Sequence, residues 1–217
     1  MAASRPFRVI LDFDTGALTP FTGSFARRLS EMADAWADQG EVARLLAAGQ
    51  DPVIYTGYDA DVPHDAGHLP FRTTIISPGT VGGEYFMTKG HHHCRDTAEV
   101  YVGMSGTGLM IMETRGGEFA SAALEPCASV YVPPGWAHRT VNTGGVPLVF
   151  LAAYPGDAGH DYAAIERSGF SRRVFRGPSG PELRGTAGRE PGGTSRPEPG
   201  GTSGPAPGGT SGLEPRP

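Results

Sequence analysis

Residues 90–106, GHHHCRDTAEVYVGMSG, place three consecutive histidines shortly before a glutamate that opens a run of strand-forming residues. In an extended segment alternate side chains point to opposite faces, so His91 and His93 share one face and His92 leaves by the other. A five-residue connection follows His93, and Glu99 begins the next strand, where it can face back toward the two histidines. The stretch therefore predicts a site that includes His91, His93 and Glu99 and leaves His92 outside.

A second stretch, PPGWAHRTVN at residues 133–142, adds His138 after a turn made by two prolines and a glycine. Three imidazoles and one carboxylate form a mixed nitrogen and oxygen donor set. Such a set suits Fe(II), Mn, Ni or Zn, whereas Ca and Mg prefer oxygen ligands. We expect one divalent metal per subunit, with Fe(II) as the expected ion and Mn, Ni or Zn as alternatives.

The chain between residues 52 and 176 consists of short β-rich runs separated by Gly, Pro and Asp. Eight of these runs have the length of a strand: VIYTG, RTTIIS, GEYFMT, EVYVGM, GLMIME, SVYVPP, HRTVN and PLVFLAAY. Segments such as TRGGE and NTGGVP have the composition of turns. Many short strands without intervening helices predict an all-β domain, either a sandwich or a barrel of the jelly-roll kind.

The segment before this domain, residues 1–51, is expected to be an N-terminal extension with a helix. Within residues 22–49, Phe25, Leu29, Met32 and Trp36 recur at helical spacing. A break near Gly40 and a second short helix ending at residue 49 complete the expectation.

The segment after it, residues 177–217, contains 12 glycines and 9 prolines and no aromatic residue. It also contains the eight-residue repeat PGGTSRPE, PGGTSGPA, PGGTSGLE. Such a composition offers too little apolar surface to offset the entropy of ordering, so we expect a disordered tail.

The charge of the chain narrows its possible partners. The net charge is −5, from 18 basic and 23 acidic residues that are scattered along the sequence. This argues against a nucleic-acid surface and against a polybasic membrane anchor. No stretch approaches the length of a membrane span, and the two cysteines, Cys94 and Cys127, are expected to be free thiols. We therefore expect a cytoplasmic protein that binds neither nucleic acid nor membrane.

Two sets of residues resemble the paired motifs of the cupin family. His91-x-His93 with Glu99 and Gly106 resembles the first motif, and Pro133-x-Gly135 with His138 and Asn142 resembles the second. The flanking strings SPGTVGGEYFMTKGHHH, AEVYVGMSGTGLM, YVPPGWAHRTVNTG and PLVFLAAYPGDAGHDY resemble the cupin-type phosphoglucose isomerases, the archaeal type that some bacteria also have. This resemblance covers about residues 70–170.

The resemblance implies a cupin β-barrel at residues 52–176 and an enzyme that interconverts glucose 6-phosphate and fructose 6-phosphate. It implies that His91, His93, Glu99 and His138 bind the metal and that Glu99 also acts in catalysis. It places further residues around the sugar phosphate, namely Thr74, Thr88, Gly90, Tyr101, Tyr154, His160 and Tyr162. A homodimer is expected from the family. Because the protein is acidic and the substrate is an anion, local positive charge must come from the metal, Lys89 or Arg139.

The chain departs from the family pattern at a few positions, and other functions remain open. The family usually has one more residue between His93 and Glu99, which bears on where the carboxylate lies. A cupin oxygenase uses the same ligand set, a phosphomannose isomerase performs the same chemistry on another sugar, and a non-catalytic cupin would bind metal or sugar without turnover.

Overall fold

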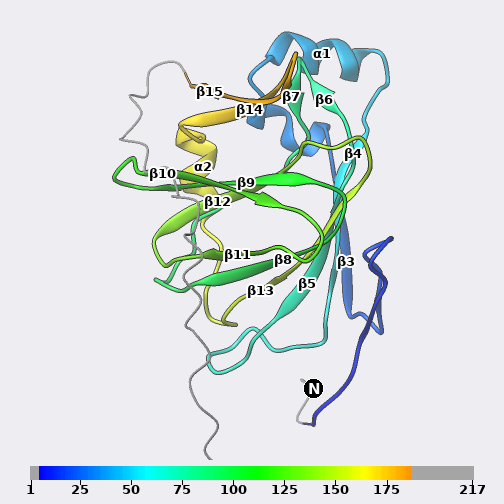
Figure 1. The fold of residues 1–217 in the computed structure, drawn as a ribbon, viewed down its shortest axis with the longest axis vertical. Helices are drawn as coiled ribbons and strands as arrows, with labels where there is room; N and C mark the ends of the chain where they lie inside the picture. The colour runs from blue at the N-terminus through cyan, green and yellow to red at the C-terminus, as the bar shows by residue number, and fades with distance from the viewer. Residues whose placement is uncertain (1–4, 187–217) are drawn as a thin grey trace, which may run out of the picture.

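The largest layer of the computed structural model, which describes residues 5–186, is an antiparallel sheet of six strands (Figure 1). In spatial order its strands are β11 (Ser129–Val132), β8 (Glu99–Ser105), β13 (Leu148–Ala153), β5 (Phe71–Ile76), β4 (Val53–Asp59) and β3 (Gly23–Arg28). Strand β13 pairs with both β5 and β8, so segments that are far apart in the chain meet at the centre of the layer.

A second sheet of three strands lies across the first and is formed by β10 (Phe119–Leu124), β9 (Gly108–Thr114) and β12 (Trp136–Asn142). Ile76 and Leu148 of the large sheet and Met110 of the small sheet are fully buried in one core cluster. This apolar core holds the two sheets together, because burying such side chains is the main favourable contribution to folding.

The remaining elements close one end and one outer face of the two sheets. A sheet of four short strands contains β15 (Gly180–Gly185), β14 (Arg172–Gly177), β7 (Glu84–Tyr85) and β6 (Thr80–Val81), and a hairpin contains β1 (Ile10–Leu11) and β2 (Leu18–Thr19). The helices are the 3₁₀ segment η1 (Ser30–Ala35), α1 (Gln39–Ala47) and α2 (Tyr162–Ser168). A buried ion pair between Arg173 Nη1 and Glu84 Oε1, 2.9 Å long, links β14 to β7.

The all-β prediction is confirmed, and each of the eight strand-length runs contains a strand. The sheets of the described residues stay separate and are not joined by hydrogen bonds into one closed barrel. Strand β10 was not predicted, because its sequence, FASAAL, is rich in alanine and lacks β-branched residues. It forms because β9 offers a full antiparallel register to its backbone.

The helix expected from residue 22 is wrong in its first part. Residues Gly23–Arg28 form β3, which pairs with β4, and its side chains alternate between half-buried and exposed. The apolar residues matched a helical period, but they belong to different elements. Phe25 lies in a strand, whereas Met32 is buried in η1 and Trp36 is buried just after it. Gly40 does not break a helix but lies in the first turn of α1, which Asp38 caps by accepting a 2.8 Å hydrogen bond from the N–H of Glu41.

The structure also changes what was expected at both ends of the β-rich domain. Strand β3 precedes residue 52 yet shares a sheet with the strands that follow it, so the extension and the domain pack as neighbours. The tail was expected to be disordered from residue 177, but Gly180–Gly185 forms β15 because its backbone pairs with β14. The eight-residue repeat lies outside the described residues.

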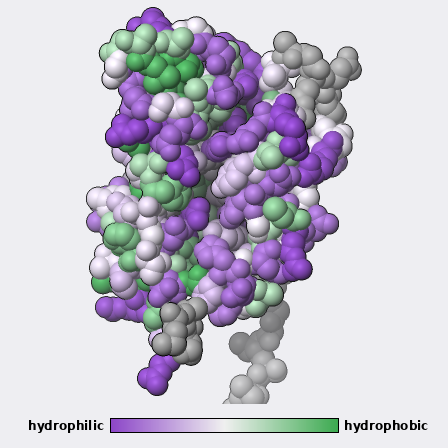
Figure 2. All heavy atoms as spheres, turned by 180° about the vertical axis from the view of Figure 1, so that it is seen from behind, coloured by the Kyte–Doolittle hydropathy of each residue, from purple (hydrophilic) through white to green (hydrophobic). Residues whose placement is uncertain are grey.

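The surface agrees with the scattered charges of the sequence. On the face shown in Figure 2, hydrophilic side chains spread over the whole surface and are interrupted by smaller apolar patches. No helix within residues 5–186 is long and apolar enough to cross a membrane. Cys94 and Cys127 are free, as expected, and both are exposed.

The side-chain amide of Asn142 stabilises the end of β12 through hydrogen bonds, and a substitution there tests this role. Its side chain is fully buried, donates 2.9 Å hydrogen bonds to the carbonyls of Ile76 and Val146, and accepts one from the N–H of Gly144. Asn142→Ala should lower the free energy of unfolding by about 2–4 kcal/mol, because buried backbone groups lose their partners. Urea unfolding followed by circular dichroism measures this change.

Val146→Ala is the control, since that side chain is 57% exposed in the same turn. It should change the free energy of unfolding by less than about 0.5 kcal/mol. An equal effect of the two substitutions would contradict the role given to the amide.

Candidate active site

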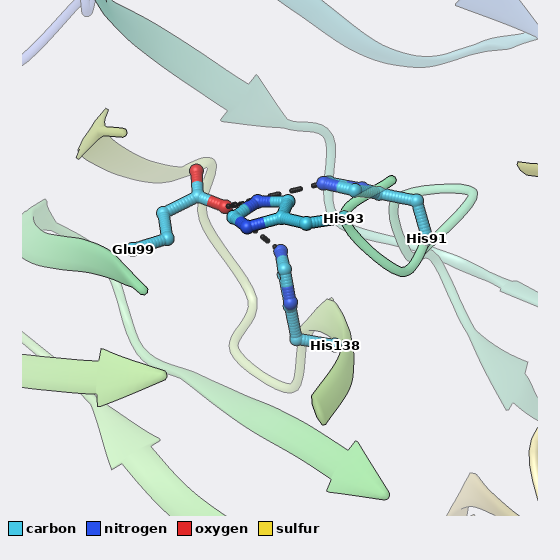
Figure 3. Close-up of side chains that lie close together, drawn as sticks. All are labelled: His91, His93, Glu99 and His138. Atoms are coloured by element: carbon cyan, nitrogen blue, oxygen red, sulfur yellow. Dashed lines mark hydrogen bonds and ion pairs between the residues drawn. The ribbon is translucent and has the colours of Figure 1, made fainter. Parts of the chain in front are cut away.

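Four side chains with metal-binding atoms converge between the two main sheets (Figure 3). Glu99 begins β8, His138 lies in β12, and His91 and His93 lie in the segment that leads to β8. Their ligand atoms are all within 4.8 Å of one another. Glu99 Oε2 is 2.9 Å from His138 Nε2, 3.1 Å from His93 Nε2 and 3.9 Å from His91 Nε2.

The backbone brings these residues together by pairing that the sequence spacing alone did not reveal. The N–H of His91 donates to the carbonyl of His138 over 3.2 Å, and the N–H of His138 donates back over 3.1 Å. His92 makes the same kind of bridge to a different partner, Asp161. The histidine segment is therefore irregular, with neighbouring residues paired to opposite sides.

The alternation inferred for the segment still describes its side chains. His91 and His93 belong to the ligand group, whereas His92 and Cys94 do not. His92 is buried on the other side, in the field of Arg115 and Asp161. The connection between His93 and Glu99, which is shorter than in the family pattern, still lets the carboxylate reach all three imidazoles.

Hydrogen bonds on the far side of two rings orient their ligand atoms. His93 Nδ1 lies 2.9 Å from both the carbonyl and the hydroxyl oxygen of Thr97, and His138 Nδ1 lies 3.3 Å from the carbonyl of Trp136. A ring that donates from Nδ1 keeps the lone pair of Nε2 free, which is the arrangement found in metal-binding histidines.

Two of these Nε2 atoms, those of His91 and His138, are buried and lie 3.9 and 2.9 Å from Glu99 Oε2, but neither makes a well-directed hydrogen bond to the described residues. Buried polar atoms are normally paired, because leaving one unpaired costs free energy. The residues present thus fit a bound cation, which would satisfy both atoms.

The protonation states of Glu99 and His91 also favour the binding of a cation. Burial raises the pKa of Glu99, but the imidazoles of His138 and His93, 2.9 and 3.1 Å from its Oε2, outweigh it and hold that pKa well below its ordinary value. Burial, aided by the neighbouring His138, lowers the pKa of His91 well below its ordinary value. Burial also lowers the pKa of His93, yet its hydrogen bond to Glu99 raises it overall. An ionised carboxylate is therefore surrounded by imidazoles, of which His91 is neutral.

A cavity of about 390 Å³ opens beside this group, between the large sheet and β12. All the residues that the family resemblance placed around a sugar phosphate line it, namely Thr74, Thr88, Gly90, Tyr101, Tyr154, His160 and Tyr162. Other lining residues were not predicted from the sequence, namely Phe25, Arg27, Tyr55, Arg72, Thr140, Phe150 and Ala152. Two of these lie on β3, and the signal that could have found them is the alternation in SFARR.

Aromatic rings and one further imidazole line the cavity beside His91. His160 stacks on Tyr162 with the ring centroids 5.8 Å apart, and it contacts Tyr154 edge-on at 5.2 Å. Burial lowers the pKa of His160 to about 4, so this ring is neutral near pH 7. Burial, then the charge of Glu99 and a hydrogen bond to it, raise the pKa of Tyr101 well above its usual range. Tyr101 is therefore a hydroxyl donor beside the carboxylate.

Three cationic side chains line the cavity, and each is paired with a carboxylate. Lys89 Nζ lies 2.6 Å from Glu166, Arg72 lies 2.8 Å from Asp59, and Arg27 lies 3.3 Å from Glu31. Lys89 was expected to supply positive charge here, whereas the two arginines were not identified.

The expectation that Arg139 also faces the substrate is wrong. His138 and Thr140 point into the cavity, so the residue between them on β12 must point to the other face of the strand. Arg139 is 3% exposed, stacks over Phe170 and donates a 2.7 Å hydrogen bond to the carbonyl of Lys89.

Comparisons with known proteins agree with the predicted resemblance. Residues 26–177 match the family model described as "Glucose-6-phosphate isomerase (GPI)". A "Glucose-6-phosphate isomerase" of Thermococcus gammatolerans is 47% identical over 80% of this chain and 91% of its own length. Proteins with the same name from Pyrococcus horikoshii, 47% identical over 78% of this chain and 89% of theirs, and Sinorhizobium medicae, 39% identical over 77% and 79%, are also similar.

The matched residues 26–177 include all four residues of the ligand group and every lining residue of the cavity except Phe25. The chain belongs to the glucose-6-phosphate isomerase family.

Proposed function

We propose that this protein interconverts glucose 6-phosphate and fructose 6-phosphate with one divalent metal held by His91, His93, Glu99 and His138. The observation that carries the proposal is the convergence of these four ligand atoms within 4.8 Å at the wall of a polar cavity. The donor set suits Fe(II), Mn, Ni or Zn, and of these we expect Fe(II). When bound, such a metal polarises the carbonyl and hydroxyl oxygens of the open-chain sugar and makes the C2 hydrogen more acidic.

Glu99 is proposed to move the hydrogen between C1 and C2. An enediol route needs one group that removes a proton from C2 and returns it to C1 on the same face of the sugar, while the hydroxyl proton of O2 passes to O1. The ionised, buried carboxylate of Glu99 lines the cavity and is the group of this type beside the ligand histidines. An alternative is direct hydride transfer between the carbons, in which Glu99 only orients the site.

The other cavity residues are proposed to bind the sugar phosphate. Thr74, Thr88, Tyr101, Tyr154 and Tyr162 offer hydroxyl groups, Gly90 offers a peptide N–H, and His160 offers a neutral imidazole. Peptide N–H groups together with hydroxyls can hold a phosphate without a P-loop. Lys89, Arg27 and Arg72 also line the cavity and can donate to an anion, and each shares its charge with one carboxylate.

The lining of the cavity also weighs against the rival functions. A cupin oxygenase with an apolar substrate would gain little from three cations and so many hydroxyls. A phosphomannose isomerase has the same chemistry, so activity on mannose 6-phosphate is part of the test below. A non-catalytic cupin has no need of an ionised carboxylate among the ligands.

We also propose that the enzyme works in the cytoplasm as a homodimer. Free, exposed thiols at Cys94 and Cys127 suit a reducing compartment. The dimer is expected from the family resemblance, and a single species of 22.7 kDa in light scattering would contradict it.

Metal reconstitution tests the proposed reaction. The metal-stripped protein should be inactive, and adding Fe(II), Mn, Ni or Zn should restore interconversion of fructose 6-phosphate and glucose 6-phosphate, with mannose 6-phosphate assayed in parallel. A stoichiometric metal without turnover of any of these sugars would favour the non-catalytic cupin. Full activity of the stripped protein would contradict the metal.

Glu99→Gln tests the proposed acid–base residue. The amide cannot accept a proton, so turnover should fall by about 100-fold to 10,000-fold while the metal content stays near one per chain. Turnover under substrate saturation and metal analysis measure the two effects. Glu118→Gln, at an exposed position, is the control, and near-normal turnover of metal-loaded Glu99→Gln would remove this residue from the mechanism.

The three adjacent histidines provide a graded test of the metal site. His91→Ala and His93→Ala should each weaken metal binding by about 100-fold or more, because each removes a ligand. His92→Gln should leave metal affinity within a few-fold of the original, because that side chain lies outside the ligand group. Metal competition titrations measure all three, and an equal loss in His92→Gln would contradict the assignment of the segment.

A further inference from the structure

The peptide bond between Lys89 and Gly90 is held on one side by a buried arginine and opens to the cavity on the other. Arg139 Nη2 donates a 2.7 Å hydrogen bond to the carbonyl oxygen of Lys89. In a trans peptide the C=O and the following N–H point in opposite directions. The N–H of Gly90 therefore points away from the Arg139 guanidinium, and Gly90 itself lines the cavity.

This N–H makes no hydrogen bond to another group in residues 5–186. Backbone N–H groups rarely stay unpaired in a folded protein, so a donor that faces a cavity is available to a ligand or to water. One open peptide donor is thus available at this point of the wall.

The surroundings of Gly90 fix the direction of this donor. Its φ of +75° lies in the left-handed region that favours glycine. A Cβ there would lie 2.7 Å from the ring of Phe170 and 3.1 Å from Cβ of Arg139, so the side of the peptide that faces Arg139 is fully packed. The peptide cannot rotate without losing its bond to the guanidinium.

Arg139 is costly for the fold in this position. It is 3% exposed, and its Nε has no hydrogen-bond partner among the described residues. The charges of Glu84 and Glu113 partly offset this cost. A methionine of similar length could pack on Phe170 without the free-energy cost of burying a charge. The contribution of the guanidinium near the cavity is therefore its hydrogen bond to the carbonyl of Lys89.

We propose that Arg139 is a positioning residue for substrate binding, which holds the carbonyl of Lys89 so that the N–H of Gly90 donates to an anionic oxygen of the substrate. The guanidinium also polarises this peptide unit, which strengthens the donor on its other end. Donors to an ionised oxygen form the stronger class of hydrogen bond. The inference rests on the proposed function, in which this cavity binds a sugar phosphate.

Lys89 is the single lysine in the chain, which allows a direct test by NMR. Zinc-loaded, full-length protein labelled with ¹³C-carbonyl lysine and ¹⁵N-glycine has one lysine–glycine pair and so gives one correlation signal, from Gly90. A second sample with ¹³C-carbonyl methionine and ¹⁵N-threonine reports on Thr88 alone, since Met87–Thr88 is the single Met-Thr pair. Both samples are titrated with inorganic phosphate.

The Gly90 amide proton should move downfield on addition of phosphate, as expected for a new hydrogen bond to an anion. In Arg139→Met the shift should shrink, and the dissociation constant for phosphate should rise about tenfold. In Arg139→Met, KM for fructose 6-phosphate should rise by a similar factor, while kcat stays within about threefold of the wild-type value. Arg139→Lys keeps a charged donor, so its KM and its dissociation constant for phosphate should lie between those of the wild-type protein and Arg139→Met. Arg172→Met is the matched control, because Arg172 stacks over Phe119 at 4.6 Å just as Arg139 stacks over Phe170 at 4.6 Å.

Each result decides between the two proposals. A shift at Thr88 without one at Gly90 would overturn the role of Arg139 and leave the proposed function standing. The absence of both shifts would show that phosphate does not bind in this cavity and would overturn both. If Arg139→Met folds and binds phosphate as tightly as the wild-type protein does, Arg139 has a structural role only. If Arg139→Met does not fold, the shift of Gly90 in the wild-type protein and the phosphate titration of Arg139→Lys decide whether Arg139 positions the donor.

Discussion

The reciprocal backbone pairing of His91 and His138 is the constraint on which the rest of the site depends. It joins the irregular histidine segment to β12, so that ligands separated by nearly fifty residues in the chain come within contact of one carboxylate. Glu99 reaches the same point from the other sheet, at the first residue of β8. The apolar core between the sheets sets this separation, because the sheets can approach only as closely as their buried side chains allow.

The same arrangement concentrates polar groups where the fold would otherwise be apolar. Two imidazole nitrogens are buried without a well-directed hydrogen bond, and a carboxylate that is 3% exposed stays ionised because imidazoles surround it. Unpaired buried groups reduce the stability of a protein, and they persist where function uses them. In a member of the glucose-6-phosphate isomerase family, the use that fits these groups is the binding of a cation and an anionic sugar.

Side chains on the two faces of β12 have different roles, because successive residues of a strand point to opposite sides. His138 and Thr140 face the cavity, while Arg139 faces the C-terminal segment and the carbonyl of Lys89. The segment at Phe170 thereby lies against the back of the site, although it contributes no residue to the cavity. Residues that line neither the cavity nor the ligand group can in this way affect the direction of a donor inside it.

The sequence by itself determined the all-β class, the main strands and the four candidate ligands, because strand periodicity and donor chemistry are local properties. The motif strings also determined the family, since such strings are specific without any knowledge of the fold. Features that depend on pairing between distant segments could not be predicted in this way. Strand β3, for example, was predicted to be a helix, because its apolar residues also fit a helical period and only pairing with β4 decides between strand and helix.

Only the tertiary structure decided which cations face the cavity. Arg27 and Arg72 enter it because their strands join the large sheet, and Arg139 leaves it because its two neighbours on β12 already face inward. Which face of a strand becomes the inside depends on the sheet that packs against it. That partner is distant in the chain, so no local pattern can specify it.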